Sequence, residues 1–233
     1  MSEPATASRH PGRLVAWLGF VLALTALNYA GRFAADDTAE EDIAYQWISS
    51  IGVVVQFGLM LGVLLLIAKG LPKRELFALR RPRSWKRALG LATACLVAIY
   101  LASLAYTGLL SLLGDFDPTE EQGLVPDGWD SSRAAPFVAF FLAVTLLAPI
   151  VEELTYRGLG FSLLTPYGVV LAIVVTGLLF GLTHGLLIGL PVLAFFGIVV
   201  GWLRTKTDSV YPGMLLHATF NAVALLIAVS GAG

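Results

Sequence analysis

Charged residues are scarce in this chain of 233 residues: Asp, Glu, Lys and Arg make up 13% of it, about half the share found in a typical soluble domain. Hydrophobic residues make up 57%, and they lie in long runs rather than in the short periodic patterns of a soluble core. A soluble globular fold is therefore not expected, because runs of this kind need lipid around them.

The chain also lacks an excess of basic residues and has almost no cysteine. Fifteen Lys and Arg residues stand against 16 Asp and Glu, which gives a net charge of -1 with the three His neutral. Nucleic acid is therefore not an expected partner. The single cysteine, Cys95, lies inside an apolar run, so an intrachain disulfide and a cysteine-based zinc site are both excluded.

Seven apolar stretches predict membrane-spanning helices. A span needs about 20 mostly apolar residues, and backbone groups cannot stay unpaired in hydrocarbon. No stretch shows the alternation of a membrane barrel strand. The predicted fold class is therefore all-α, a polytopic transmembrane helical bundle of about seven spans, of which the sixth is the shortest. The predicted spans are Arg13–Tyr29, Trp47–Ala68, Ala88–Leu113, Ala135–Leu163, Val169–Leu190, Val192–Leu203 and Val210–Val229.

The distribution of charge predicts how these spans are oriented. The loop Lys69–Arg87 carries eight of the 15 basic residues, so it is expected on the cytoplasmic side, with some attraction to anionic lipid. The acidic connections Asp36–Asp42 and Asp115–Asp130 are then expected outside. Alternation places three further segments inside, in a plasma-membrane protein: the amino terminus, the turn Thr165–Gly168 and the turn with Arg204 and Lys206.

Residues 1–30 could instead form a secretory signal, because Arg9 and Arg13 precede an apolar stretch that ends near the small residues Ala30 and Gly31. The apolar stretch is long for a signal, and six further spans follow it. A first membrane span is therefore favoured.

Six polar side chains interrupt the last four predicted spans. A charged group at the centre of a spanning helix costs roughly 2.5–3.5 kcal/mol on insertion scales, and such residues are functional candidates by default. A single buried His or Asn often serves only to join two helices, but six polar residues at similar depth favour a site. They are Glu152, Glu153, Arg157, His184, His217 and Asn221.

The spacing from the turns indicates that these side chains share one layer. Glu152 and His184 lie 14 and 18 residues from Pro166, at the turn between their helices, which corresponds to roughly 21 and 27 Å of helix. They can therefore meet. His217 and Asn221 lie at a matching depth from the next inner turn.

Helical spacing also separates their roles. Glu153 and Arg157 are four residues apart, in the favourable order for an ion pair. Glu152 lies about 100° further around the helix and is the candidate general base. His217 and Asn221 are also four apart, so that they could present two hydrogen-bond donors to a developing oxyanion.

Glycines recur at four-residue intervals in the fifth predicted helix and continue in the sixth. Small residues let membrane helices approach closely, and here they could bring His184 against a neighbouring helix. The glycines are Gly177, Gly181, Gly185 and Gly189, followed by Gly197 and Gly201.

Three short motifs in order resemble those of the CPBP intramembrane proteases, which include the Ras-converting type of CAAX prenyl protease and the bacterial Abi proteins. Each motif alone is weak, but their order within apolar helices is fairly specific. They are Glu-Glu-x-x-x-Arg (Glu152, Glu153, Arg157), Phe-x-x-x-His (Phe180, His184) and His-x-x-x-Asn (His217, Asn221).

This resemblance implies a role for each motif residue. Glu152 would be the general base and His184 its partner on the hydrolytic water, while His217 and Asn221 would hold the oxyanion. It also implies two parts of the chain: amino-terminal helices over residues 1–133 and a catalytic four-helix core over residues 134–233. Water is scarce in a bilayer, so the site is expected to open to the cytoplasmic side.

The sequence leaves open whether the protein binds a metal ion. Glu152, His184 and His217 could bind zinc with a water as fourth ligand. The chain has no His-Glu-x-x-His helix, however, and ligation would use up the proposed base and donor. A metal-independent glutamate mechanism is therefore favoured over zinc.

The predicted function is an intramembrane endopeptidase. Its partners would be the lipid bilayer and a membrane-associated peptide or protein; prenylated CAAX tails and peptides such as bacteriocins are equally open as substrates. Two alternatives are a proton- or ion-coupled transporter, against which the lack of an inverted repeat counts, and a non-catalytic membrane scaffold.

Overall fold

The computed structural model describes residues 10–34, 43–114 and 128–230, and within these ranges it contains helices and no strand. The predicted all-α bundle is confirmed. The α-helices are α1 (Pro11–Ala34), α2 (Trp47–Ile67), α3 (Lys73–Leu76), α4 (Trp85–Leu113), α6 (Ala134–Leu142), α7 (Ala148–Glu153), α8 (Phe161–Leu164), α9 (Val169–Thr183), α10 (Leu190–Thr207) and α11 (Tyr211–Val229).

Six helical segments in the described part of the chain are long and apolar enough to cross a membrane. One of them, Ser131–Tyr167, joins α6, α7 and α8 through two π-helical segments, Ala143–Leu147 and Leu154–Gly160. The fifth predicted span, Val169–Leu190, corresponds to α9, which has only 15 residues. The predicted number of spans is therefore close to the observed one.

Two predicted boundaries were wrong. The fifth span was expected to run to Leu190, but α9 ends at Thr183, and the sixth helix, α10, is a full 18 residues rather than the shortest span. The backbone of Gly185 has φ +69°, a left-handed conformation that ends a helix. His184 therefore lies at the end of α9, beside a loop that continues to Gly189.

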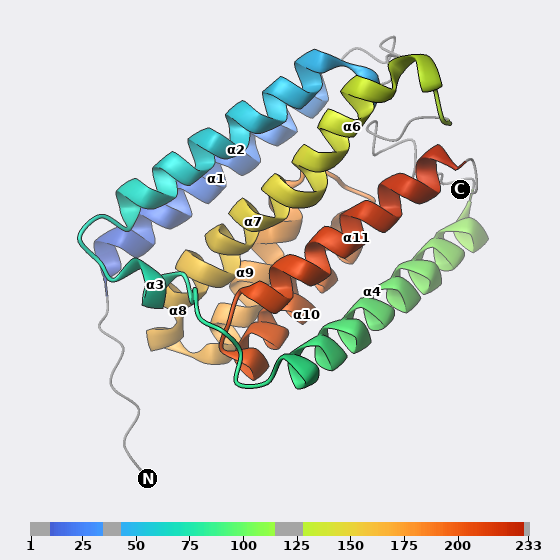
Figure 1. The fold of residues 1–233 in the computed structure, drawn as a ribbon. Coiled ribbons are helices and arrows are strands. Elements are labelled where there is room, and N and C mark those ends of the chain that lie inside the picture. The colour runs from blue at the N-terminus through green and yellow to red at the C-terminus, as the bar shows by residue number, and fades with distance from the viewer. Residues whose placement is uncertain (1–9, 35–42, 115–127, 231–233) are drawn as a thin grey trace.

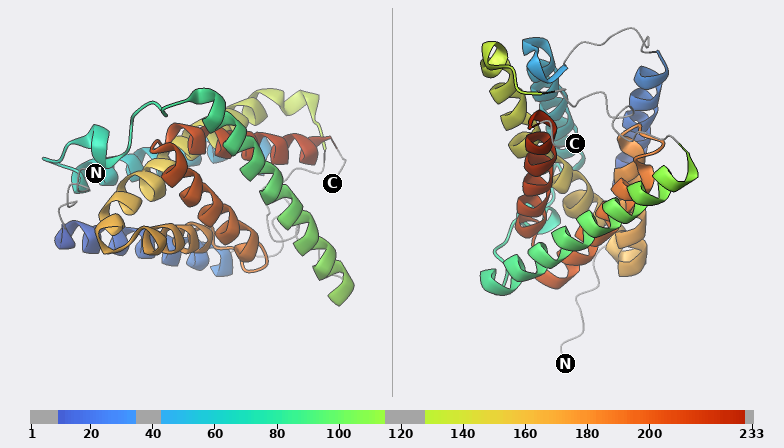
Figure 2. Two further views of the ribbon diagram at one scale, coloured as in Figure 1. Left: turned by 90° about the horizontal axis from the view of Figure 1, so that it is seen from below. Right: turned by 90° about the vertical axis from the view of Figure 1, so that its right-hand side faces the viewer.

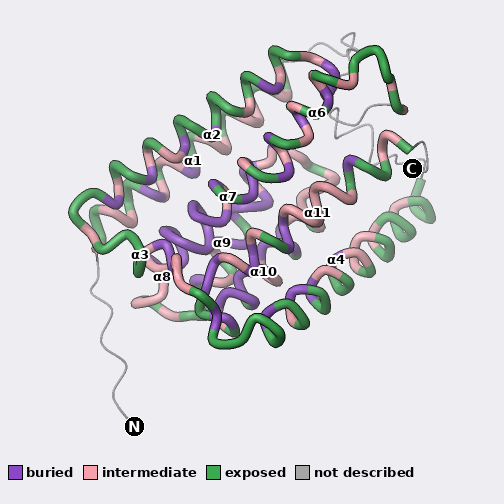
Figure 3. The backbone as a smooth tube through the Cα atoms, in the orientation of Figure 1, coloured by how far each residue is buried: buried purple, intermediate pink, exposed green. Residues whose placement is uncertain are grey.

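In the view of Figure 1, α1 and α2 overlap along one side of the bundle and α4 lies on the opposite side, whereas the turned view of Figure 2 shows α1 and α2 apart. The α6–α8 segment and helices α9–α11 lie between them, and α4 crosses at an oblique angle (Figure 2) to contact α10 and α11. Burial is concentrated in this central group (Figure 3). The outer faces of α2 and α4 expose large apolar side chains such as Leu59 and Leu104, as lipid-facing helices do.

Basic segments from distant parts of the sequence meet at one end of the bundle. Arg13 in α1 donates hydrogen bonds to the carbonyls of Ile67 and Lys69, and the amide of Val210 donates to the carbonyl of Ala78 over 3.3 Å. The amino end of α1, the basic loop and the α10–α11 turn therefore share one end, as the charge pattern predicts. The acidic residues 36–42 and 115–127 lie outside the described residues.

Glycine pairs bring α9 and α10 into close contact. A Cβ atom on Gly177 would lie 2.6 Å from the backbone nitrogen of Ile198, and one on Gly197 would lie 2.5 Å from the carbonyl oxygen of Gly177. Only glycine fits at such a backbone contact, so the predicted role of these glycines in helix packing is confirmed.

Gly177→Ala is expected to lower the free energy of unfolding by about 1–3 kcal/mol, because the added methyl group overpacks a backbone contact. Gly58→Ala in α2 is the matched control, since a Cβ there meets nothing within 4 Å and alanine is the better helix former. Thermal unfolding in detergent measures both. An equal effect of the two substitutions would contradict the close α9–α10 contact.

Candidate active site

The six polar residues come from four elements. Glu152 and Glu153 end α7, and Arg157 follows in the π-helical segment Leu154–Gly160. His184 follows the last residue of α9, and α11 carries His217 and Asn221.

Glu153 and Arg157 form a buried ion pair. The two side chains are 0% exposed, and Arg157 Nη1 lies 3.2 Å from Glu153 Oε1. Arg157 Nη2 also donates a hydrogen bond of 2.9 Å to the carbonyl of Gly197 in α10. The ion pair predicted from the four-residue spacing is therefore confirmed, and it ties the α7 region to α10.

His217 lies between the two acids. Its Nδ1 is 3.2 Å from Glu153 Oε1 and its Nε2 is 3.4 Å from Glu152 Oε2. The ring is buried, and the rings of Phe180 and Phe196 lie against it with centroid distances of 5.5 and 4.9 Å. Both imidazole nitrogens thus face carboxylates, an arrangement that the sequence did not predict.

The two acids differ in their access to solvent. The side chain of Glu152 is 15% exposed, whereas that of Glu153 is fully buried between Arg157 and His217. Glu152 is therefore the more accessible of the two acids, and its role as general base stays a prediction.

The hydrogen bonding of His184 defines its tautomer. Its Nδ1 lies 2.7 Å from the carbonyl oxygen of Phe180, and a carbonyl only accepts, so Nδ1 carries the hydrogen. In the neutral ring, Nε2 is then free to accept a proton or a hydrogen bond. The rings of His184 and His217 both lie against Phe180, which places the two imidazoles around one aromatic side chain.

Polar residues of α1 hold the segment that carries His184. Asn28 donates its side-chain amide to the carbonyl of Thr183, Thr25 Oγ1 lies 3.2 Å from Thr183 Oγ1, and Tyr29 donates its hydroxyl to the carbonyl of Leu186 over 3.2 Å. These three residues were not among the candidates predicted from the sequence. Three polar residues within five positions of an apolar helix were the signal that could have revealed them.

Asn221 donates its side-chain amide to the carbonyl of Val144 over 3.0 Å. Val144 lies in the π-helical segment Ala143–Leu147, where a carbonyl pairs with the amide five residues later. That residue is Pro149, which has no N–H. Asn221 therefore supplies the missing donor with one of its two N–H groups.

The described residues contain no group of three or more His, Cys, Asp or Glu side chains arranged to hold a metal ion. Glu152 and Glu153 each contact His217, so both nitrogens of His217 are directed at carboxylates.

Comparison with known proteins gives one match. Residues 134–223 match the family model described as "Type II CAAX prenyl endopeptidase Rce1-like". The matched segment contains all six polar residues, and α1, α2 and α4 lie outside it. The resemblance inferred from the three motifs is therefore confirmed. The matched family is one of peptide hydrolases. Neither the curated proteins nor the solved structures give a match.

Asn221→Ala is expected to reduce stability by about 1–3 kcal/mol, because the Val144 carbonyl loses its donor. Adding Pro149→Ala should recover most of this loss, since alanine restores an N–H at the position that the π-helical pitch requires. Thermal unfolding of the single and double variants measures the recovery.

Pro136→Ala, in the first turn of α6, is the control and should recover nothing. Peptide cleavage by the stabilised double variant then separates the two roles of Asn221. If the second N–H holds the oxyanion, activity stays low although stability returns. Failure of Pro149→Ala to restore stability would contradict the claim that the Val144 carbonyl needs Asn221 because Pro149 has no N–H.

Proposed function

We propose that this protein is an intramembrane endopeptidase that hydrolyses a peptide bond of membrane-associated substrates. The observation that carries the proposal is the contact of His217 with both Glu152 and Glu153 inside the segment that matches an endopeptidase family. A buried assembly of two acids, an imidazole and a guanidinium is expensive in a membrane protein, and such cost is typical of functional sites.

Glu152 is the proposed general base, with His184 as its partner on the water. A water between them would donate one hydrogen bond to the Glu152 carboxylate and one to His184 Nε2. As its oxygen attacks the peptide carbonyl, Glu152 takes the proton and later passes it to the leaving amine as the C–N bond breaks. The balance is one water consumed and two chain ends released.

The oxyanion of the tetrahedral intermediate would be held by His217 and Asn221. His217 can offer its Nε2 hydrogen once a proton resides there, and Asn221 has a second N–H beyond the one given to Val144. Glu153 and Arg157 act behind them, because Glu153 fixes the orientation of the His217 ring through Nδ1. Such preorganised donors supply much of the rate enhancement in acyl-transfer sites.

We also propose the orientation in the membrane. The end of the bundle that carries the basic loop would face the cytoplasm by the positive-inside rule, with the amino terminus on the same side and the site open to it, in the plasma membrane. Substrates would then approach from the inner leaflet. Prenylated CAAX-type tails and unmodified membrane peptides are the two classes to compare.

Glu152→Gln is expected to lower peptide cleavage by about 10²–10⁴-fold, the usual contribution of a general base, with little change in thermal stability. Glu153→Gln should instead lower stability by about 3–5 kcal/mol, because it leaves Arg157 buried without its counter-charge. Glu75→Gln, on the exposed helix α3, is the control and should change neither property.

A peptide library incubated with the purified protein in detergent provides the measurement and identifies the bond that is cut. Wild-type cleavage that persists in Glu152→Gln would contradict the assigned base. Ion flux in proteoliposomes without peptide cleavage would favour the transporter, and a cellular function that survives both Glu152→Gln and His184→Ala would favour the scaffold.

Stringent chelation is expected to leave the activity of the purified protein unchanged, because the proposed mechanism uses Glu152 and His184 rather than a metal. The measurement compares cleavage rates before and after dialysis against a strong chelator. A loss of activity that added zinc restores would replace the glutamate mechanism with a metal-dependent one.

A further inference from the structure

A pocket of about 550 Å³ lies at the basic end of the bundle, away from the six candidate site residues. It is lined by Arg74, Leu79, Arg80, Arg81, Trp85 and Tyr211. Three arginines thus share one pocket between the α3–α4 loop and the first turn of α11.

The loop that carries these arginines is fixed to the bundle. Phe77 and Ala78 are buried, and Phe77 packs so closely on Gly158 that a Cβ there would lie 3.0 Å from the phenylalanine ring. The Ala78 carbonyl accepts the amide of Val210. The segment that carries the arginines is therefore held in place by packing and by a backbone hydrogen bond to the bundle.

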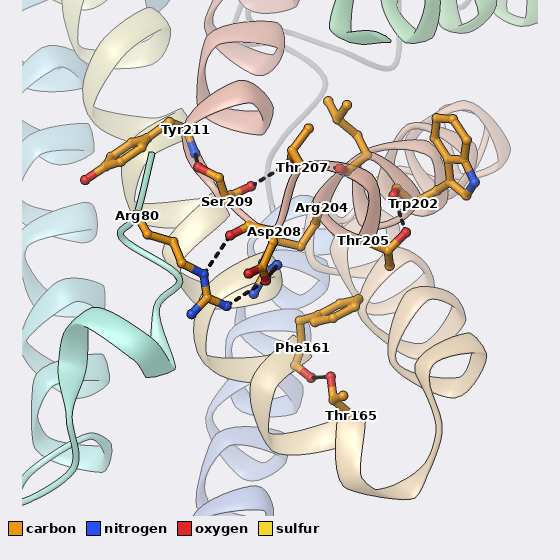
Figure 4. Close-up of polar contacts among 11 residues, drawn as sticks. Arg80, Phe161, Thr165, Trp202, Arg204, Thr205, Thr207, Asp208, Ser209 and Tyr211 are labelled. Carbon is orange, nitrogen blue, oxygen red and sulfur yellow. Dashed lines mark hydrogen bonds and ion pairs between the residues drawn. The ribbon is translucent and has the colours of Figure 1, made fainter. Parts of the chain in front are cut away.

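Arg80 is held by the α10–α11 turn. Its Nε donates to the backbone carbonyl of Asp208 over 2.8 Å and its Nη2 lies 2.6 Å from Asp208 Oδ1 (Figure 4). Arg204 Nη1 reaches the same Oδ1 over 3.0 Å. Partial burial raises the pKa of Asp208, but hydrogen bonds from Arg80 and Arg204 outweigh it and hold this pKa below its usual range.

Asp208 therefore keeps its negative charge. Its carboxylate pairs with Arg80 and Arg204, so it does not neutralise the other two arginines of the pocket. Arg74 donates from Nε to the carbonyl of Leu79 over 3.4 Å, which satisfies a donor without neutralising the charge. Arg81 is exposed and forms no hydrogen bond or ion pair with any residue in the described ranges. Among the described residues, the guanidinium groups of Arg74 and Arg81 at the pocket thus lack a carboxylate partner.

We propose that this pocket binds the phosphate of an anionic phospholipid, with Arg74 and Arg81 as its principal ligands and Arg80 as a fixed side of the site. Guanidinium groups bind phosphate oxygens through paired hydrogen bonds, and basic pockets between membrane helices are suited to anionic head groups. The proposal does not depend on the peptidase assignment.

The surroundings of the pocket favour a lipid over a free phosphate ion. Trp85 and Tyr211 are of the residue types that concentrate at the membrane interface. One turn deeper along the same two helices, Leu89 in α4 and Leu215 in α11 are 41% and 49% exposed. These apolar side chains offer a surface for acyl chains directly beneath the charged pocket.

The test compares Arg74→Gln/Arg81→Gln with Arg83→Gln/Arg87→Gln in the full-length protein. Both pairs remove two charges from the basic segment Lys69–Arg87, but Arg83 and Arg87 do not line the pocket. Native mass spectrometry with added phosphatidylglycerol or phosphatidylcholine measures the lipid bound. We expect wild type to retain phosphatidylglycerol preferentially and the pocket pair to lose roughly tenfold or more in affinity, with the control pair close to wild type.

Three results would overturn the proposal. An equal loss in both pairs would mean diffuse attraction to the basic loop rather than a site. Full displacement of the lipid by inorganic phosphate would make the ligand a free anion. Unchanged lipid binding in the pocket pair, together with altered cleavage of peptides that bear a free carboxyl terminus, would assign the arginines to a peptide instead. Thermal unfolding of each variant establishes that it is folded.

Discussion

The buried ion pair between Glu153 and Arg157 is the interaction on which the rest of the core depends. Neither side chain reaches solvent, so each charge would carry a large desolvation cost without the other. The pair is bound to two further helices, through the Gly197 carbonyl in α10 and through His217 in α11. The ion pair thus contacts His217, which in turn contacts Glu152.

Two π-helical segments interrupt the continuous helix Ser131–Tyr167, which carries Glu153 and Arg157. The first leaves Val144 without a backbone donor, because Pro149 occupies the position that would supply it, and thereby creates a partner for Asn221. The second contains Arg157 and Gly160, and Trp17 packs where a Cβ on Gly160 would lie, only 2.1 Å from its ring. Irregular backbone is tolerated here because side chains from α1 and α11 complete its hydrogen bonds.

Much of the fold and part of the site could be predicted from the sequence. Long apolar runs determine helices in lipid, and the spacing of Glu153 and Arg157 predicts their ion pair without knowledge of tertiary structure. The clustering of the basic loop with the α10–α11 turn follows from charge alone. In each of these cases the information lies within one segment or in a single physical rule.

The remainder depends on contacts that no local pattern records. A π-helical pitch among apolar residues has no sequence period of its own, so the partner of Asn221 could not be foreseen. The end of α9 depends on the left-handed backbone of Gly185, one glycine among several at the same interval. That both nitrogens of His217 face acids depends on how α11 rotates against α7, which spacing along either helix leaves open.

Helix α1 lies outside the segment that carries the motifs, but it forms hydrogen bonds to the residues around His184. The matched segment begins at residue 134, yet Thr25, Asn28 and Tyr29 hold the residues on either side of His184. Gly185 also lies against the backbone of Asn28, with 3.3 Å between its ideal Cβ and the carbonyl carbon. A loop that ends a short helix in a membrane has few hydrogen bonds of its own and needs donors from elsewhere. The first helix supplies them, so residues outside the matched segment help to position its first histidine, His184.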